Sequence, residues 1–457
     1  MPETRQDGQA LDLPPGMRAT LLVCIIASTL AVVVTFYYPG ALLLILLAAT
    51  APISFMRPRL LFYTLVALLP LPMFLATGLP IRDLGSAARI GLFLVLIVRM
   101  YSGGRIRILH WLTGGTITRL LLIYVVICIA SVAINPITYE SYRSLLRLLS
   151  YLALYYSSLA LLQTEADVKT TAKVLMGSTL VICIVSFWQF ISNDPGTVWH
   201  LLYDNDELAY VWVRRVTSLF KTENQFAAYL NWMIAFGIGF SFVRGDRSLR
   251  ILSISASATG LVALILTQSR GALIGFVGIV VLSLVILPLS ARVRTLWITI
   301  CTAVALVIFG ALTALPERFS TLDPEALTRL QIFAIAIDLI RRAPLIGIGY
   351  GSFPAYTEGL LPHMLDTHNL YLKLWAETGI IGMLAYLWMK FIVVRTGFAV
   401  RHTSPVMHAV AFAVLAGTTA EMIHGMVDVF LQVIPVSCVA WMLIAMLATP
   451  KASKETR

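Results

Sequence analysis

The stretch ILSISASATGLVALILTQSRGALIGFVGIVVLSLVILPLS, residues 251–290, decides the fold. It contains two apolar runs, 251–267 and 272–290, and only the residues from Gln268 to Gly271 join them. About 20 apolar residues are enough for a helix to cross the hydrocarbon core of a bilayer. The stretch therefore predicts two membrane helices that run in opposite directions, with Arg270 held at the membrane boundary by the short link.

The whole chain has the composition of a membrane protein. Of its 457 residues, 59% are hydrophobic and 12% are charged, and the mean hydropathy is +0.86. Soluble proteins contain about 25% charged residues, so the composition excludes a soluble globular protein. It predicts an all-α, polytopic membrane protein with roughly 12 to 14 transmembrane helices. The expected spans lie near 19–37, 41–56, 60–77, 88–101, 119–134, 144–163, 170–192, 225–243, 251–267, 272–290, 296–315, 370–393, 407–424 and 428–448.

Basic residues in the short links predict the orientation. Short loops rich in Lys and Arg remain in the cytoplasm, and the net charge of +11 fits contact with anionic lipid and does not imply nucleic acid. Both termini are expected on the cytoplasmic side, and the long connections 193–224 and 316–369 on the outer side. The basic residues assigned to the cytoplasmic side are Arg57, Arg59, Arg105, Arg107, Arg244, Arg247, Arg250, Arg292, Arg294, Arg395, Arg401, Lys451, Lys454 and Arg457.

The chain divides into regions by these spans. We expect a transmembrane region over 1–315, an outer loop region over 316–369, C-terminal transmembrane helices over 370–448 and a cytoplasmic tail over 449–457. Within the loop region the pattern from Pro324 to Arg341 predicts a helix, with Asp323 as its N-cap and an end before Pro344. The glycines of 347–351 predict a tight turn.

Many cations fall on the side where the positive-inside rule does not expect them. Most are arginines, whose planar fork of donors matches phosphate oxygens and stays charged when partly buried. They therefore predict an anionic, phosphorylated ligand. For Arg82, Arg89, Arg318 and Arg329 the alternative is a helix-end residue whose long side chain reaches the interface. The cations assigned to the outer face are Arg82, Arg89, Arg143, Arg147, Arg214, Arg215, Lys221, Arg270, Arg318, Arg329, Arg341, Arg342 and Lys373.

Arg270 is the strongest candidate among these cations. An ionisable residue held so close to hydrocarbon is a functional hypothesis by default. Arg214 and Arg215 end a long loop just before a polar group that opens the next helix, and one of the two is expected to face the ligand.

His368 stands at the start of a membrane helix. An imidazole there can act as a general base for a hydroxyl nucleophile, and the alternative is a cap or interface residue. His363, Asp366 and His368 could also suggest a metal site, but no shared helix face supports it. The acidic run 204–207, with Asp204 and Asp206, is either an oxygen site for a divalent metal or solvated surface. The five cysteines lack metal or disulfide spacing, and we predict no metal and no cofactor.

Several short motifs, taken in order, resemble the O-antigen ligase and polymerase superfamily of bacterial envelope glycosyltransferases. The ordered set, with a long outer connection before its histidine, spans about residues 214–382, and the earlier helices match only in hydropathy. The motifs are RVTSLF at 215–220 with Asn224, SRGA at 269–272, PLIGIG at 344–349, THNLYL at 367–372 and ETGIIG at 377–382.

The resemblance implies transfer of a glycan from undecaprenyl diphosphate to an acceptor hydroxyl on the periplasmic face of the bacterial inner membrane, without nucleotide sugar or metal. Three enzymes share this architecture: the O-antigen ligase that uses lipid A core as acceptor, the O-antigen polymerase and the protein O-oligosaccharyltransferase. We favour the ligase, because the outer loop is moderate in length and the chain has no large soluble C-terminal domain. A transporter of anionic lipid is the alternative from another class, although the chain lacks the internal repeat that many transporters show.

The resemblance also implies roles for particular residues. It points to His368 as the base near the acceptor hydroxyl, and to Arg215 and Arg270 as contacts of the diphosphate. Fixed guanidinium donors stabilise the charge that develops on such a leaving group. A single displacement without a covalent intermediate would invert the anomeric configuration. Residues expected to contact the phosphates or the acceptor core are Arg147, Arg214, Arg341 and Arg342.

Overall fold

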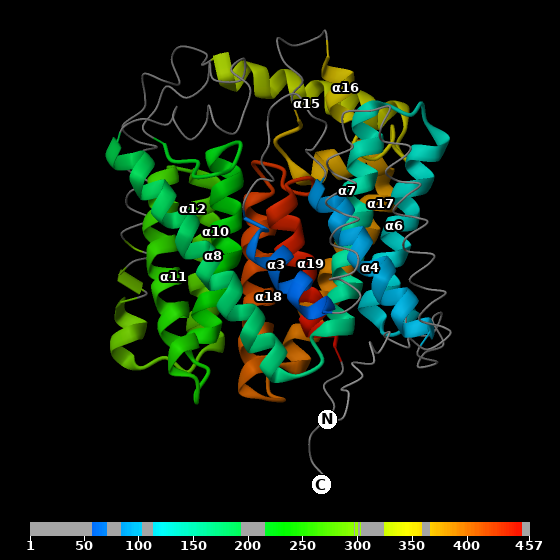
Figure 1. Cartoon of the computed structure of the whole chain (residues 1–457). Coiled ribbons are helices and arrows are strands. Elements are labelled where there is room, and N and C mark those ends of the chain that lie inside the picture. Colours follow the sequence, from blue (N-terminus) through cyan, green and yellow to red (C-terminus); the bar gives the residue numbers. More distant parts are fainter. Residues whose placement is uncertain are drawn as a thin grey trace, which may run out of the picture.

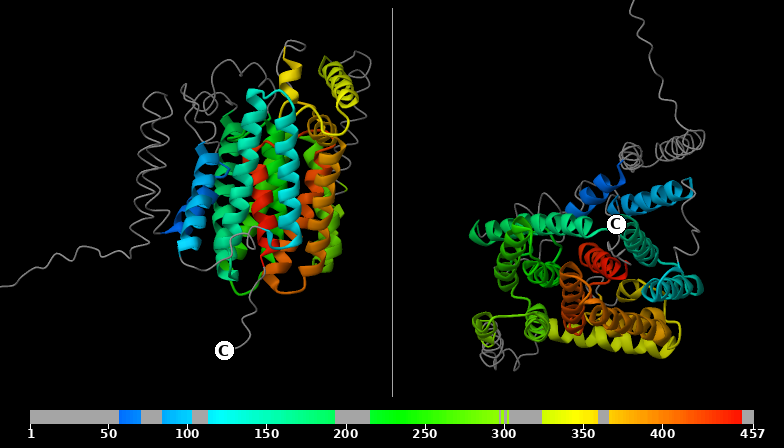
Figure 2. Two further views of the ribbon diagram at one scale, coloured as in Figure 1. Left: turned by 90° about the vertical axis from the view of Figure 1, so that its right-hand side faces the viewer. Right: turned by 90° about the horizontal axis from the view of Figure 1, so that it is seen from below.

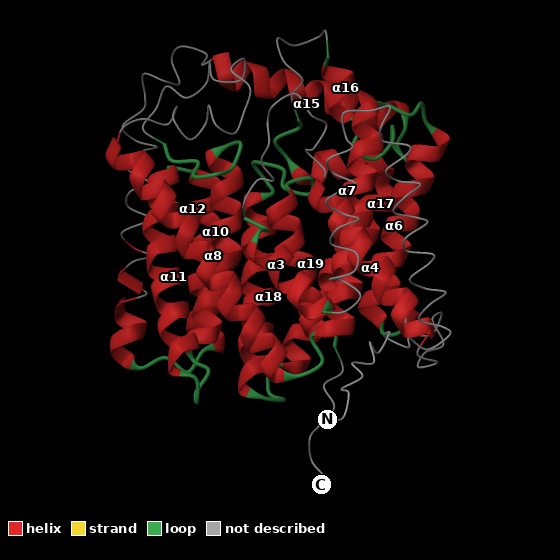
Figure 3. Ribbon diagram, in the orientation of Figure 1, coloured by secondary structure: helices red, strands yellow, loops and turns green. Residues whose placement is uncertain are grey.

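The computed structural model describes residues 57–70, 84–102, 113–192, 215–296, 298–299, 302, 324–358 and 366–449. Within these ranges every regular element is a helix, which confirms the all-α prediction (Figures 1 and 3). The helices are α3 (Pro58–Ala67), α4 (Leu84–Ser102), α6 (Thr116–Ile134), α7 (Tyr139–Leu161), α8 (Glu165–Ser192), α10 (Glu223–Ser241), α11 (Arg247–Thr267), α12 (Arg270–Ile286), α15 (Pro324–Arg342), α16 (Phe353–Thr357), α17 (Leu370–Val400), α18 (Pro405–His424) and α19 (Ile434–Ala448).

Helices long and apolar enough to cross a membrane make up much of the described chain. Six of them meet this criterion, namely α6, α7, α8, α11, α17 and α18. Shorter apolar helices include α3, α12 and α19. The chain is therefore a polytopic membrane protein. The expected spans at 19–37, 41–56 and 296–315 lie wholly or largely outside the described residues.

Successive helices from α6 to α12, and again from α17 to α19, alternate in direction, so their links gather at two ends of the bundle (Figure 1). We call the end with the links 135–138, 268–269 and 425–433 the site end. The other end, with the links 162–164, 242–246 and 401–404, is the opposite end. The helix α15 lies across the site end, and its bounds confirm the helix expected from Pro324 to Arg341.

The centre of the bundle is closely packed around α10, which is buried from Phe226 to Phe240. Small residues allow this approach. A Cβ on Gly239 would lie 2.7 Å from the carbonyl oxygen of Ala409 in α18, and one on Gly237 would lie 2.9 Å from that of Ser253 in α11. Close packing of this kind is how helices associate in lipid, where no hydrophobic effect drives them together.

The long helix α17 is broken at Gly379, where φ is 66°. The segment 344–349 crosses this break, and a Cβ on Gly379 would lie 2.1 Å from the carbonyl carbon and oxygen of Leu345. Only glycine tolerates both this φ and this contact. Four backbone hydrogen bonds join the two segments: Ile348 to Ala376 at 2.9 Å, Gly349 to Glu377 at 3.0 Å, Ile380 to Pro344 at 2.9 Å and Ile381 to Leu345 at 3.4 Å.

The glycine-rich stretch after α15 forms the tight turn that the sequence predicts. Gly347, Gly349 and Gly351 all have positive φ, between 77° and 108°. A Cβ on Gly351 would lie 2.3 Å from Cβ of Ser144, so the turn sits directly on the start of α7. Two of the recognised motifs, at 344–349 and 377–382, are thus the two sides of one backbone junction at the site end.

Candidate active site

The link between α11 and α12 presents Arg270 at the site end. Gln268 adopts a left-handed conformation with φ of 54°, which ends α11 and allows α12 to begin two residues later. Arg215 fastens this link, because its Nε donates to the carbonyl of Thr267 at 3.0 Å and its Nη2 to that of Gln268 at 3.4 Å. Arg270 itself is exposed at the first position of α12.

Arg215 has a third partner, since its Nη1 forms an ion pair with Glu223 at 2.7 Å. Glu223 lies in the first turn of α10, so the guanidinium joins the start of one helix to the end of another. Its five N–H donors are only partly used by these contacts. Arg215 therefore has a structural role in holding the link, and two donors remain for a ligand.

The loop that carries Arg215 is anchored from α8. The backbone of Ser218 exchanges two hydrogen bonds with the side-chain amide of Gln189, at 2.8 and 2.9 Å. Gln189 is 5% exposed and was not singled out from the sequence, because an isolated glutamine in an apolar helix gives no local signal of its partner. Its amide fixes Ser218 in a left-handed conformation with φ of 49°.

His368 stands immediately before α17 and faces an acidic residue from the link between α18 and α19. Its Nδ1 lies 3.6 Å from Oδ1 of Asp428. The backbone at His368 is left-handed, with φ of 48°. The next residue, Asn369, caps α17 by accepting from the amides of Tyr371 and Leu372. Nδ1 of the imidazole therefore faces a carboxylate, and Nε2 is the nitrogen left for another group.

The start of α17 and the end of α18 are joined by backbone contacts that hold this pair. The amide of Leu370 donates to the carbonyl of Gly425 at 2.7 Å, and Nδ2 of Asn369 donates to the carbonyl of Met426 at 2.9 Å. These bonds fix the distance between the segment of His368 and that of Asp428.

The turn at the end of α18, residues 424–428, also packs against the start of α12. A Cβ on Gly271 would lie 2.4 Å from Val427 and 2.7 Å from the ring of His424. Arg270 is the residue before Gly271, so its backbone is adjacent to the 424–428 turn that carries Asp428. The structure therefore brings the segments of Arg215, Arg270 and His368 together at the site end.

Backbone strain is concentrated in these same segments. Among the described residues, the non-glycine residues with positive φ are Ser218, Gln268 and His368. Such conformations cost about 1–3 kcal/mol each and tend to cluster at functional sites. Their occurrence in the three segments that meet at the site end supports a functional role for this region.

A buried ion cluster lies next to His368. Lys373 is fully buried and contacts both oxygens of Asp366, at 2.8 and 2.9 Å, and Oε1 of Glu377 at 2.9 Å. Oε1 of Glu377 also accepts from the amide of Phe353 at 3.1 Å. The cluster ties the loop before His368 to the first part of α17 and to the start of α16. Asp366 is thus engaged by Lys373, which the metal interpretation did not anticipate.

The secondary candidates are distributed differently. Arg147 is half-buried on α7, near Tyr350 of the glycine-rich turn; burial raises the pKa of the Tyr350 hydroxyl, and the charge of Arg147 partly opposes this. Arg341 and Arg342 are exposed at the end of α15, where Arg342 pairs with Asp338 at 2.6 Å. No hydrogen bond or ion pair between described residues connects these two arginines to His368. Arg214, His363, Asp204 and Asp206 lie outside the described residues.

Arg89 differs from the expectation of an outer-face or interfacial cation. It is 3% exposed in α4, and its Nη2 donates to the hydroxyls of Ser86 and Ser150 at 3.0 and 3.1 Å. Ser150 lies near the middle of α7, far from both ends of that helix. Arg89 therefore lies in the interior of the bundle. The sequence could not show this, because the partner hydroxyls come from packing with α7.

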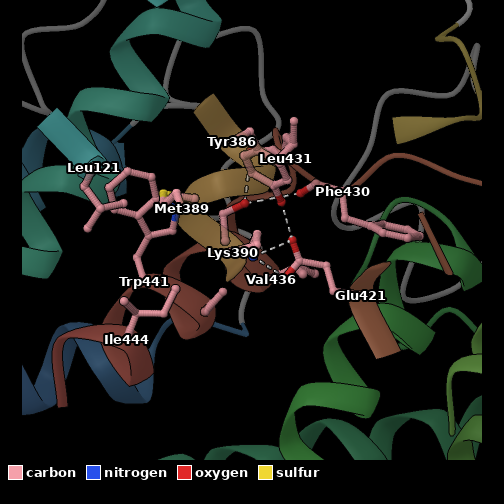
Figure 4. Close-up of a pocket in the computed structure, with 12 residues that line it drawn as sticks. Leu121, Tyr386, Met389, Lys390, Glu421, Phe430, Leu431, Val436, Trp441 and Ile444 are labelled. Carbon is pink, nitrogen blue, oxygen red and sulfur yellow. Dashed lines mark hydrogen bonds and ion pairs between the residues drawn. The ribbon is translucent and has the colours of Figure 1, made fainter. Parts of the chain in front are cut away.

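Below the site, Lys390 and Glu421 form an ion pair inside the bundle, with Nζ 2.9 Å from Oε2 (Figure 4). The hydroxyl of Tyr386 donates to Oε1 of Glu421 at 2.8 Å. The three side chains line a cavity of about 20 Å³, which is room for about one water molecule. Such pairing is what makes ionisable groups tolerable at membrane depth. Lys390 thereby provides Glu421 with a partner of opposite charge inside the bundle.

Metal binding has no obvious location in the part of the chain that the structure describes. There, no three His, Cys, Asp or Glu side chains lie close enough together to hold a metal ion. What the site end offers is a partly exposed imidazole that faces a carboxylate, together with the hydrogen-bonded guanidinium of Arg215 and the exposed Arg270 at the start of α12. This combination suits proton transfer beside an anionic group.

Comparison with known proteins agrees with the resemblance in the motifs. The family model described as O-antigen ligase matches residues 255–387. The matched region contains Arg270, His368 and the junction between 344–349 and the break in α17. Arg215 and Asp428 lie outside it. The comparison with curated proteins found no match to the chain.

Proposed function

We propose that this chain is a glycosyltransferase that moves O-antigen polysaccharide from undecaprenyl diphosphate to a sugar hydroxyl of lipid A core. The observation that carries the proposal is the packing of the 424–428 turn, which places Asp428 opposite His368, against Gly271, the residue after Arg270. The match of residues 255–387 to the O-antigen ligase family supports the same class of reaction. The reaction takes place on the periplasmic face of the bacterial inner membrane, with both termini in the cytoplasm.

His368 acts as the general base. The acceptor hydroxyl oxygen attacks the anomeric carbon of the donor, its proton moves to Nε2 of His368, and the bond from the anomeric carbon to the diphosphate oxygen breaks. The electron pair of that bond leaves with the diphosphate. Asp428 faces Nδ1 and stabilises the imidazolium that forms, so it is a positioning residue for the base.

Arg270 contacts the diphosphate. Negative charge on the leaving oxygen grows during the reaction, and a fixed cation stabilises it most in the transition state. Because the carrier diphosphate leaves well, no acid need protonate it. Arg215 holds the link that presents Arg270 and offers its remaining donors to the same phosphates. Arg147, Arg214, Arg341 and Arg342 are secondary contacts of the phosphates or of the acceptor core.

The mechanism is a single displacement, so the anomeric configuration of the transferred sugar inverts. The configuration of donor and product can be compared by NMR from the coupling constant of the anomeric proton. Inversion is expected. Retention would exclude a single in-line displacement and would overturn the mechanism.

The first experiment combines purified protein with undecaprenyl diphosphate-linked glycan and lipid A core, with a chelator present, and follows product size on a gel. We expect glycan to appear on the core in one step, without added metal, and to be lost in His368→Ala. Elongated carrier-linked glycan would instead identify an O-antigen polymerase, and transfer to a protein acceptor a protein O-oligosaccharyltransferase. No covalent product with any acceptor would favour a transporter of anionic lipid, which requires a sealed membrane to work.

A further inference from the structure

The exposed surface of α15 is divided into two chemically different sectors. Its buried face, with Ile332, Ala336, Leu339 and Ile340, packs toward α16 and the first part of α17. At about 100° per residue, Leu330, Ala334 and Ile337 fall in a sector about 60° wide. Gln331, Asp338 and Arg342 fall in another sector about 40° wide, and the two centres are about 90° apart. Both sectors are exposed, with Leu330 60% and Ile337 43% accessible.

The apolar sector continues into the chain that follows α15. Leu345 is 61% and Ile346 39% exposed, and the carbonyl of Leu345 accepts from the amide of Ile381 in α17. Ile381 begins a stripe of exposed apolar residues at helical spacing on the spanning part of α17, with Leu384 and Trp388. On a membrane-spanning helix such a stripe faces lipid. The exposed apolar surface beside the end of α15 is therefore continuous with a lipid-facing surface.

The orientation and charge of α15 also fit a helix in contact with lipid. The helix lies across the bundle and along its edge beside α17 (Figures 1 and 2). Arg341 falls within the angular range of the apolar sector, at its C-terminal end, and is exposed. Helices that lie in the plane of a membrane interface have an apolar face in the acyl boundary and basic residues that contact lipid phosphates.

We propose that α15 is an interfacial helix whose apolar sector, Leu330, Ala334 and Ile337, lies in the headgroup region of the lipid leaflet at the site end. Arg341 lies there at the level of the phosphate groups of the leaflet, those of a carrier lipid included, and the sector of Gln331, Asp338 and Arg342 faces water. This proposal rests on exposure, continuity and orientation and is independent of the reaction proposed above.

Neighbouring residues provide a matched test. Leu330→Cys and Gln331→Cys are one residue apart, both exposed and in different sectors; Ile337→Cys and Asp338→Cys form a second such pair. Each is labelled with an environment-sensitive fluorophore in protein reconstituted into nanodiscs of phosphatidylethanolamine and phosphatidylglycerol. Quenching is measured with iodide in the water and with a spin label attached high on the lipid acyl chain.

We expect labels at 330 and 337 to be quenched by the spin-labelled lipid and to have iodide quenching constants several-fold lower than labels at 331 and 338. Equal iodide quenching within each pair would overturn the proposal. Protection of 330 and 337 from both quenchers would also overturn it, because a protein surface would then cover the sector. A background without native cysteines is preferred. Should it not remain monodisperse, labelled wild-type protein is subtracted, which corrects for Cys24 and Cys301 as well as for Cys128, Cys183 and Cys438, the last three of which are fully buried.

Discussion

Replacing Asp428 by asparagine tests the geometry of the proposed base most directly. The change preserves the size of the side chain and removes its charge, while Nδ1 of His368 still has an oxygen or amide nitrogen opposite it. In the wild-type protein the two atoms are 3.6 Å apart. If the carboxylate acts only on the imidazole, the loss of rate reports on the imidazolium that forms during transfer.

The size of the loss follows from the separation and the exposure of the pair. Two unit charges at 3.6 Å interact by about 1 kcal/mol in water and about 5 kcal/mol at an effective dielectric constant of about 20. The side chains are 30% and 16% exposed, which places the pair between these limits. Taking about 2 kcal/mol, we expect the transfer rate of Asp428→Asn to fall about 30-fold.

The assay measures the initial rate of glycan transfer with purified donor and acceptor at saturating donor. His368→Ala is expected to lose at least about 100-fold, as is typical when a general base is removed. Because Asp428 acts through His368, the double variant should be no slower than His368→Ala alone. Asp246→Asn serves as the control, since it removes a paired carboxylate at the opposite end of the bundle.

Two results would refute this reasoning. A rate for Asp428→Asn within about twofold of wild type would remove the carboxylate from the mechanism, because even the weakest coupling considered predicts a larger loss. A further loss when Asp428→Asn is added to His368→Ala would show that the carboxylate acts on something other than the imidazole.

Other predictions concern the leaving group, the backbone junction and a charged contact away from the site. Arg270→Ala should lower the transfer rate about 100- to 1,000-fold with the protein still monodisperse in detergent, and a wild-type rate would exclude Arg270 from the mechanism. Gly379→Ala should lower the melting temperature sharply, because its Cβ would lie 2.1 Å from backbone atoms at a φ of 66°. Gly177→Ala is the control and should be tolerated, because a Cβ there has no atom within 4 Å. Equal changes in melting temperature for the two variants would contradict the close contact at Gly379. The Lys173 ammonium beside Asp246 lowers the pKa of that carboxyl, so the contact stabilises the fold above about pH 4 and the stabilisation is lost as the pH falls further. The difference in melting temperature between wild type and Asp246→Asn should therefore shrink between about pH 5 and pH 2, and a constant difference would contradict this sign.

The break in α17 shows that two motifs separated in the sequence can form a single structural feature. Glycines at 347 and 379 belong to different motifs, and each is close to the backbone of the other segment. The motif pattern indicated that these positions matter. Only the folded chain shows that they matter together, because one segment satisfies the backbone groups that the break in the other leaves open.

The sequence by itself determined the membrane character of the chain, its helical class, the helix of the long connection and the position of Arg270 at a helix boundary. These follow from properties of consecutive residues: apolar length, and the need of a chain in lipid to satisfy its hydrogen bonds within a helix. Tertiary structure decided that Asp428 is opposite His368, that Arg215 fastens the link of Arg270, and that Glu421 pairs with Lys390. The members of each of these contacts lie on different helices or links, so their distances depend on how the helices pack and not on any spacing along the chain.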